Sequence, residues 1–246
     1  MMTGIVYDSY MDYVQSMCSE DNLTNFKSSP KYTRILEHLS AEEGLQYLEC
    51  ILTFTKMSLD DINSFCAIND KIGNPRMHEY SFGKASPTSL RYVFHSHLIL
   101  SYMKSIHMDT ANIVEVGGGY GGLCLALYHF AHLYDICITN YTIIDLPEII
   151  ALQNMYHTRN NLNGITYINA DSYGKDITAR DCFLISNYCF SEIQPQHQLE
   201  YIKYLFPKIA HGFMCWNFHK VYNFGFEMTV VDEYPCTCTG NKYVYF

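Results

Sequence analysis

Five glycines stand within six residues, at a point where a predicted strand turns into a predicted helix. The segment reads Asn112-Ile-Val-Glu-Val-Gly-Gly-Gly-Tyr-Gly-Gly-Leu123. Glycine lets the backbone approach a ligand without a Cβ in the way, and the helix that follows offers unpaired N–H donors at its N-terminus. The segment therefore predicts a nucleotide-type binding loop in which Gly117, Gly119 and Gly121 contact the ligand.

The glycines alone fit two classes of ligand. Gly117, Gly119 and Gly122 satisfy the G-x-G-x-x-G pattern of dinucleotide-binding dehydrogenases. Glu115 stands two residues before the first glycine. Together with the glycines it gives the pattern E/D-x-G-x-G-x-G, which resembles motif I of class I methyltransferases. A carboxylate at this point suits a cationic ligand better than a pyrophosphate, and S-adenosylmethionine (SAM) carries an ammonium and a sulfonium group. A tight turn with Glu115 as a loop cap is the alternative without a ligand.

Acidic residues stand at the ends of the next two predicted strands. Asp145 can accept hydrogen bonds from both ribose hydroxyls of an adenosine ligand, with Leu146 beside it, and it can equally cap the helix that starts at Pro147. Its ribose role also fits a dehydrogenase. After the third strand, Asp171 can accept the adenine amino group, with Ser172 next to it, or it is an ordinary turn aspartate.

The fourth strand ends in Ser186-Asn-Tyr-Cys-Phe-Ser-Glu192. Ligands of open α/β sheets lie outside the carboxyl ends of the strands, so we expect Asn187, Tyr188 and Glu192 to face the reacting group. Glu192 is the first choice for a general base. His219, just past the fifth strand, is the second, because its unperturbed pKa of about 6.5 suits proton transfer.

Alternating short strands and helices after residue 111 must position these side chains. The expected strands are 112–116, 140–145, 165–169, 182–187 and 211–217, and the expected helices are 121–133, 147–158 and 195–206. This order predicts an α/β fold with a Rossmann-like, doubly wound, mostly parallel seven-stranded sheet. The last two segments, Phe226–Val231 and Lys242–Phe246, lack an intervening helix and predict an antiparallel pair at the sheet edge.

The first hundred residues predict helices. Their start signals are Ser40 with Glu43, Ser58 with Asp61, and Ser86 with Pro87, and a loop is expected at Asn69–Pro87. We expect residues 1–108 to form a helical segment that caps the substrate side, and 109–246 to form the ligand-binding domain.

Composition excludes several other classes. The 246 residues are 48% hydrophobic and 17% charged, which indicates a globular fold, and a net charge of -9 disfavours nucleic acid and anionic membranes as partners. We find no long apolar segment and no secretion signal, so we expect a cytoplasmic protein without a membrane partner. The ten cysteines are scattered, which favours reduced thiols, and the acidic pairs are adjacent in sequence, so we expect no metal site.

Several stretches together resemble the family of sugar O-methyltransferases, a branch of class I SAM enzymes. The matching stretches are Asn69-Asp-Lys-Ile-Gly-Asn-Pro75, Ser89-Leu-Arg-Tyr92, Val114-Glu-Val-Gly-Gly-Gly-Tyr-Gly-Gly122, Ile144-Asp-Leu-Pro-Glu148 and Ser186-Asn-Tyr-Cys-Phe-Ser-Glu192. The resemblance implies SAM as cofactor, S-adenosylhomocysteine (SAH) as product, and a sugar or glycan hydroxyl as acceptor. It also implies association or fusion with glycosyltransferases.

Under this resemblance, four aromatic or basic side chains are expected near the acceptor. The rings of Tyr92, Tyr120 and Tyr188 can pack against sugar rings, and His95 is expected on the substrate side. Arg91 can bind the SAM carboxylate, although a surface salt bridge is an equally good interpretation. Two rival functions stay open: an NAD-dependent oxidoreductase, which the lack of a separate substrate domain disfavours, and a methyltransferase-like binding module without catalysis.

Overall fold

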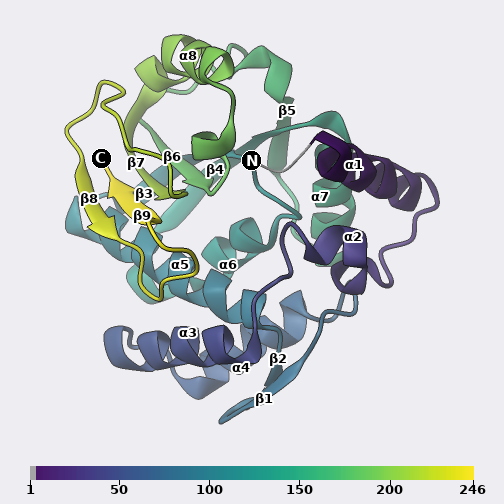
Figure 1. Ribbon diagram of the computed structural model, residues 1–246. Coiled ribbons are helices and arrows are strands. Elements are labelled where there is room, and N and C mark those ends of the chain that lie inside the picture. The colour runs from purple at the N-terminus through teal and green to yellow at the C-terminus, as the bar shows by residue number, and fades with distance from the viewer. Residues whose placement is uncertain (1–3) are drawn as a thin grey trace. The chain divides into compact units, whose positions relative to one another are not determined.

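The computed structural model describes residues 4–246 and divides the chain into two compact units. Among the described residues, the helical unit consists of residues 4–108, Gly119–Ile136 and Ala151–Asn163. The sheet unit consists of Asp109–Gly118, Cys137–Ile150 and Gly164–Phe246. Figure 1 labels the elements of both units.

A seven-stranded sheet is the framework of the sheet unit. Its strands are β3 (Thr110–Val116), β4 (Cys137–Asp145), β5 (Ile165–Asn169), β6 (Cys182–Asn187), β7 (Ile209–Trp216), β8 (Thr229–Asp232) and β9 (Lys242–Tyr245). They lie in the order β5-β4-β3-β6-β7-β9-β8 (Figure 1). The first five are parallel, whereas β9 pairs antiparallel with both β7 and β8. The predicted fold class, including the antiparallel pair at the sheet edge, is confirmed.

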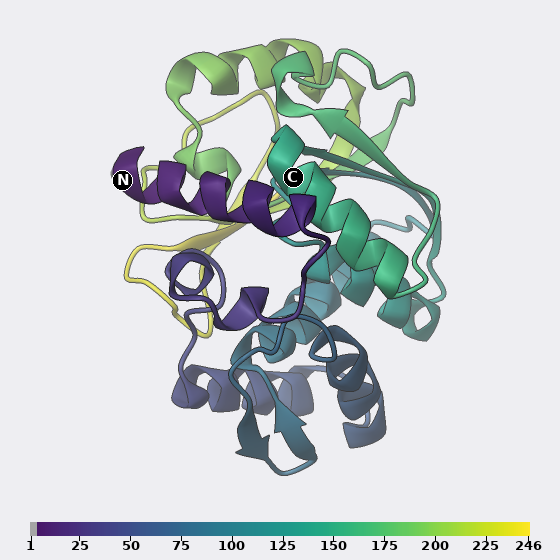
Figure 2. The ribbon, with the colours of Figure 1, turned by 90° about the vertical axis from the view of Figure 1, so that its right-hand side faces the viewer.

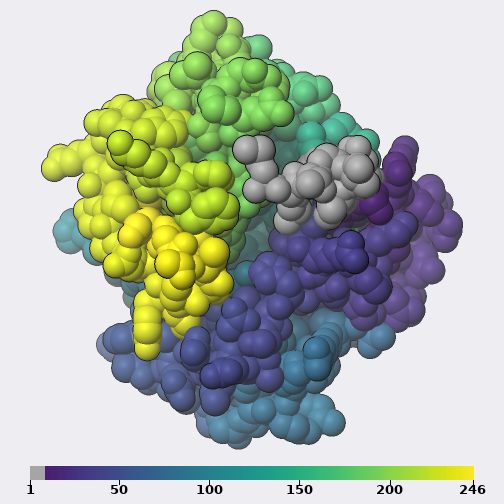
Figure 3. Space-filling model, viewed as in Figure 1, coloured from purple at the N-terminus to yellow at the C-terminus, as the bar shows by residue number. Residues whose placement is uncertain are grey.

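Burial along the strands follows their places in the sheet. In the inner strand β6, Cys182 to Ser186 are all buried, as expected for a parallel strand covered on both faces. All four residues of the edge strand β8 are exposed, and the yellow C-terminal segment lies on the surface seen in Figure 3. Strands β3 and β4 both begin before their predicted starts, and a register shift between Ala111 and Asn112 interrupts the pattern there.

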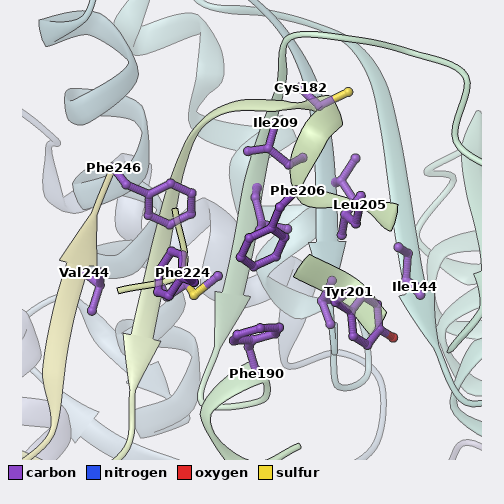
Figure 4. Packing of buried hydrophobic residues seen from close by; sticks show 14 of the residues in the cluster. Ile144, Cys182, Phe190, Tyr201, Leu205, Phe206, Ile209, Phe224, Val244 and Phe246 are labelled. Carbon is purple, nitrogen blue, oxygen red and sulfur yellow. The ribbon is translucent and has the colours of Figure 1, made fainter. Parts of the chain in front are cut away.

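One face of the sheet carries a large aromatic cluster, shown in Figure 4. Helix α8 (Pro195–Tyr204) contributes Tyr201, and the segments beside it contribute Phe190, Leu205 and Phe206. These side chains pack with sheet residues such as Ile144 and Val244. Because Phe190 is buried at 1% exposure, the short 3-10 turn Phe190–Glu192 is held directly after β6.

The helical unit contains most of the helices. They are α1 (Gly4–Ser19), α2 (Pro30–Thr33), α3 (Ala41–Phe54), α4 (Leu59–Asn69), α5 (Pro87–Ser105) and α6 (Gly122–Phe130), while α7 (Pro147–Arg159) starts in the sheet unit and ends in this one. Helix α5 packs against α3, α4 and α6, so Pro87 to Ser96 are all buried. No helix among the described residues is long and apolar enough to cross a membrane.

The predicted helix starts are confirmed by hydrogen bonds. Ser40 and Ser58 each form a complete capping box, and the Ser86 side chain accepts from the Ser89 amide. The predicted loop Asn69–Pro87 is only partly correct, because β1 (His78–Tyr80) and β2 (Gly83–Ala85) form a hairpin within it, beside α4 (Figure 2). Each strand has three residues, too few to show an alternating pattern.

Candidate cofactor site

The carboxyl ends of β3 and β4 lie at the same edge of the sheet, because Val116 pairs with Ile144 in parallel register. The chain turns sharply after Val116, and the Gly117 amide donates to the Ile144 carbonyl at 3.0 Å. The Gly118 amide then donates to Oδ2 of Asp145 at 3.0 Å. The structure thus joins the glycine turn, residues 117–122, to Asp145, the last residue of β4. The two bonded residues are 27 apart in sequence.

Asp145 is half-buried and organises this turn. One oxygen accepts from Gly118, and the other accepts from the Leu146 amide at 2.9 Å. A carboxylate accepts hydrogen bonds through several lone pairs, and hydroxyl groups are among the donors that it binds. Asp145 is therefore suited both to hold the turn and to bind a vicinal diol.

Glu115 is 1% exposed, with Oε2 accepting from the Tyr141 hydroxyl at 2.8 Å. Burial raises its pKa to about 7, with a smaller contribution in the same direction from the Asp145 charge, while the Tyr141 bond opposes the shift. A positive ligand charge nearby favours the ionised form of such a carboxyl, and a negative one disfavours it.

Gly117 has φ +78° and no room for a side chain. A Cβ built there lies 2.2 Å from Sγ of Cys189, in the segment after β6. The Ser186 hydroxyl donates to the Val116 carbonyl at 2.8 Å, which ties the same two strands together. Glycine at this position lets the turn after β3 approach the end of β6 closely.

The glycine segment continues into the helical unit, where two side chains of α7 hold its backbone. Gln153 Nε2 donates to the Gly119 carbonyl and His157 Nε2 donates to the Gly121 carbonyl, both at 2.9 Å. Burial lowers the pKa of His157 to about 4, so its imidazole is neutral at pH 7. Gly121, at φ +96°, precedes the first residue of α6. Sequence reasoning missed Gln153 and His157, whose spacing of four residues is the only signal.

The ends of β5 and β6 hold the other predicted cofactor contacts. Asp171 is exposed in a short 3-10 turn, and its amide donates to the Asn169 side chain at 3.0 Å. Ser172 is half-buried, and its hydroxyl accepts from the Gly174 amide at 3.2 Å. Asn187 is the half-buried last residue of β6.

Glu192 is partly exposed, and Asn217 Nδ2 donates to its Oε1. Burial raises the pKa of the Glu192 carboxyl, and the His219 charge opposes that shift. Asn217 Nδ2 also donates to the Tyr188 carbonyl at 3.3 Å. The Asn217 side chain therefore links Tyr188 to Glu192. His219 is exposed, and its carbonyl accepts from the Trp216 indole.

Tyr188 adopts φ +60°, a left-handed conformation that is unfavourable for a bulky residue. Its amide donates to the Cys215 carbonyl at 2.8 Å, and its hydroxyl donates to Oε1 of the buried Glu233. The other Glu233 oxygen accepts from the amide and the hydroxyl of Thr237. These hydrogen bonds fix the Tyr188 side chain, which follows the last residue of β6.

Four predicted ligand contacts lie in the helical unit and are buried: Arg91, Tyr92, His95 and Tyr120. Arg91 donates to the Leu36 carbonyl at 3.3 Å, and Tyr120 bonds Asn69. His95 is 1% exposed, and burial lowers its pKa well below the usual value. The structure presents neither His95 nor Tyr120 to a sugar, so both are left out of the candidate site, correcting that expectation. His95 lies in Pro87 to Ser96 of α5, a stretch that is buried throughout and so has no exposed face to read from the sequence. Tyr120 lies in the turn before α6, where its hydroxyl bonds the buried Asn69.

No model of a protein family matches the sequence, and a search of curated proteins found no match. Among solved structures, it is similar to a SAM-dependent methyltransferase from Aquifex aeolicus at 14% identity and a TM-score of 0.46, over 77% of this chain and 98% of that one. It is also similar to a rRNA methylase from Streptococcus thermophilus at 12% identity and 0.44, over 63% and 95%. A third is PKMT2 from Rickettsia typhi in complex with AdoHcy, at 16% and 0.35, over 44% of this chain and only 21% of that one. These likenesses are too weak to identify a ligand or a reaction.

Proposed function

We propose that the protein is a SAM-dependent O-methyltransferase that transfers a methyl group to a hydroxyl of a sugar or glycan. The donor half of this proposal is carried by one arrangement: Asp145 bonded to the glycine turn, with the buried Glu115 carboxyl two residues before Gly117. The acceptor half is supported by the family resemblance of the sequence motifs. A cytoplasmic location and an association with glycosyltransferases remain predictions from sequence.

Electrostatics favours this donor over NAD. A pyrophosphate at the turn would add negative charge beside Glu115 and Asp145, whereas a sulfonium or ammonium favours both carboxylates. The sheet differs as well. A dinucleotide fold places its strands in the order 3-2-1-4-5-6, whereas here β9 follows β7 antiparallel.

The cofactor would be held by residues from four strand ends. We assign the ribose to Asp145 and Leu146, the adenine to Asp171 and Ser172, and the remaining contacts to Asn187 and the backbone of Gly117, Gly119 and Gly121. When bound, SAM supplies an electrophilic methyl group on a sulfonium. Asp145 and the rigid turn contribute orientation, which is a large part of catalysis for an in-line displacement.

The acceptor hydroxyl needs a base. Glu192 has a raised pKa caused by burial, which brings its basicity closer to that required near neutral pH. Asn217 orients its carboxylate by donating to Oε1. Tyr188 is proposed to contact the acceptor, and His219 is the second choice of base.

Calorimetry with SAH and with NAD tests the donor. Wild-type protein is expected to bind SAH with micromolar affinity and to ignore NAD. Asp145→Asn keeps an acceptor for the Gly118 amide but removes the charge and one acceptor oxygen, so we expect SAH binding to weaken at least about tenfold. Asp176→Asn, an exposed residue of the same unit, is the matched control. NAD binding without SAH binding would instead indicate a dehydrogenase.

Turnover with isotope-labelled SAM and a panel of nucleotide sugars and short glycans tests the acceptor. Glu192→Gln is expected to keep SAH affinity and to lower turnover about a hundredfold or more, while the exposed Glu227→Gln stays at the wild-type rate. A near-normal rate in Glu192→Gln would transfer the role of base to His219. SAH binding without turnover on any acceptor would point to a non-catalytic binding module.

A further inference from the structure

Asn69, the last residue of α4, is fully buried inside the helical unit and makes hydrogen bonds to two tyrosines. Its Oδ1 accepts from the Tyr156 hydroxyl at 2.6 Å. Its Nδ2 donates to the Tyr120 hydroxyl at 3.0 Å and to Ser89 Oγ at 2.6 Å. Asn69 begins the stretch Asn69–Pro75, one of those that resemble the sugar methyltransferases.

The orientation of the Asn69 amide is fixed by its neighbours. The single Ser89 proton goes to Asp70 Oδ1 at 2.7 Å, so Ser89 Oγ must accept from Asn69. This places Nδ2 toward Ser89 and Oδ1 toward Tyr156. The Lys27 ammonium donates to the Asn69 carbonyl at 2.6 Å and lies 4.2 Å from the centre of the Tyr120 ring. Both the backbone carbonyl and the side-chain amide of Asn69 are therefore held in place by hydrogen bonds.

Tyr120 lies within the glycine turn, between Gly119 and Gly121, both at positive φ. The carbonyls on its two sides are bonded by Gln153 and His157. The Tyr120 side chain is 0% exposed, and its hydroxyl meets Asn69 across 51 residues of sequence. The turn is thus tied at three consecutive residues, and the middle one is tied through Asn69.

We propose that Asn69 is a positioning residue for the methyl donor, because it fixes the glycine turn through the Tyr120 hydroxyl. This inference rests on the proposed function only for the identity of the ligand. Loosening the Tyr120 anchor lets the turn sample other conformations, and the ligand must then order it again on binding.

Two substitutions separate positioning from general stability. Tyr120→Phe and Tyr156→Phe each delete one fully buried hydroxyl that bonds the same Asn69 side chain, but only Tyr120 belongs to the turn. We expect both to lower the unfolding temperature by similar amounts. Tyr120→Phe alone should weaken SAH binding about tenfold in calorimetry and speed hydrogen–deuterium exchange of the amides at 119–123.

The outcomes distinguish this inference from the proposed function. Equal SAH affinities in the two variants, or equal exchange rates at 119–123, would overturn the role of Asn69. Failure of the wild-type protein to bind SAH would overturn the proposed donor. In that case the exchange rates still decide the inference, because faster turn exchange in Tyr120→Phe than in Tyr156→Phe supports it and equal exchange rejects it.

Discussion

At the scale of single residues, Glu115 makes stability depend on pH. Its pKa rises from the usual 4.5 to about 7 in the folded protein, so the folded state favours the protonated acid. Stability from this group is therefore complete below about pH 4.5 and is lost as pH rises through 7, by roughly 3 kcal/mol in all.

Glu115→Gln keeps an acceptor for Tyr141 and removes the titration. We expect urea unfolding at pH 5 and pH 8 to show a smaller loss of stability in this variant than in the wild type. Only the difference between the two proteins is diagnostic, because buried histidines such as His157 titrate with the opposite sign. The same pH slope in both proteins would show that Glu115 is not the cause.

Gly117 and Gly164 allow strain and crowding to be separated. Both have positive φ, but an added Cβ at Gly117 meets Cys189 Sγ at 2.2 Å, whereas nothing lies within 4 Å at Gly164. Gly164→Ala should cost about 1 kcal/mol of unfolding free energy, from backbone strain alone. Gly117→Ala should cost about 3 kcal/mol, because overpacking adds to the strain. Similar losses in urea titrations would mean that the Cys189 contact yields easily.

The sequence was sufficient to predict the acids at the strand ends, because the position of Asp145 follows from where its strand ends. It was not sufficient to predict Asn69, Gln153 or His157. The bonds by which these three side chains hold residues 119–121 span 34 to 51 residues of sequence, and a hydrogen bond over that distance leaves no local pattern. Tyr120 was predicted to face a sugar for the same reason, since nothing near it in sequence announces its bond to Asn69.

At the scale of elements, the capping box of α3 gives a direct test. The Ser40 side chain accepts from the Glu43 amide at 3.2 Å, and Glu43 Oε2 accepts from the Ser40 amide at 2.7 Å. Ser40→Ala is expected to lower the free energy of unfolding by about 1 kcal/mol, and Ser40→Thr by much less. Unfolding curves of the two variants that coincide would show that this helix start does not limit stability.

The parallel strands were predictable because buried β-branched runs separated by helices have few other solutions, and β6 is the clearest of them. The residues at which helices end were harder to predict. Helix α6 ends at Phe130, and residues 131–134 continue as a 3-10 turn rather than as the predicted helix. Whether the last turn of a helix changes from α to 3-10 geometry depends on local packing, and the spacing of hydrophobic residues does not indicate it.

At the scale of the whole molecule, the two units are interleaved along the chain. The sequence suggested a simple division at residue 108, with a helical cap before it and a ligand-binding domain after it. In the structure, α6 and the second half of α7 group with the N-terminal helices. Sequence spacing could not show this grouping, because it follows from the contacts of α6 with α4 and α5.

Because the two units are interleaved, a fragment cut at residue 109 would separate helices that pack against each other. A fragment starting at residue 109 would retain α6 but lose α5, uncovering side chains such as Leu123, Leu127 and Phe130 that are now sealed from water. We expect that fragment to be insoluble or to show no sharp thermal transition in circular dichroism, while the full chain melts cooperatively. A fragment that melts cooperatively would instead show that residues 109–246 fold without α5.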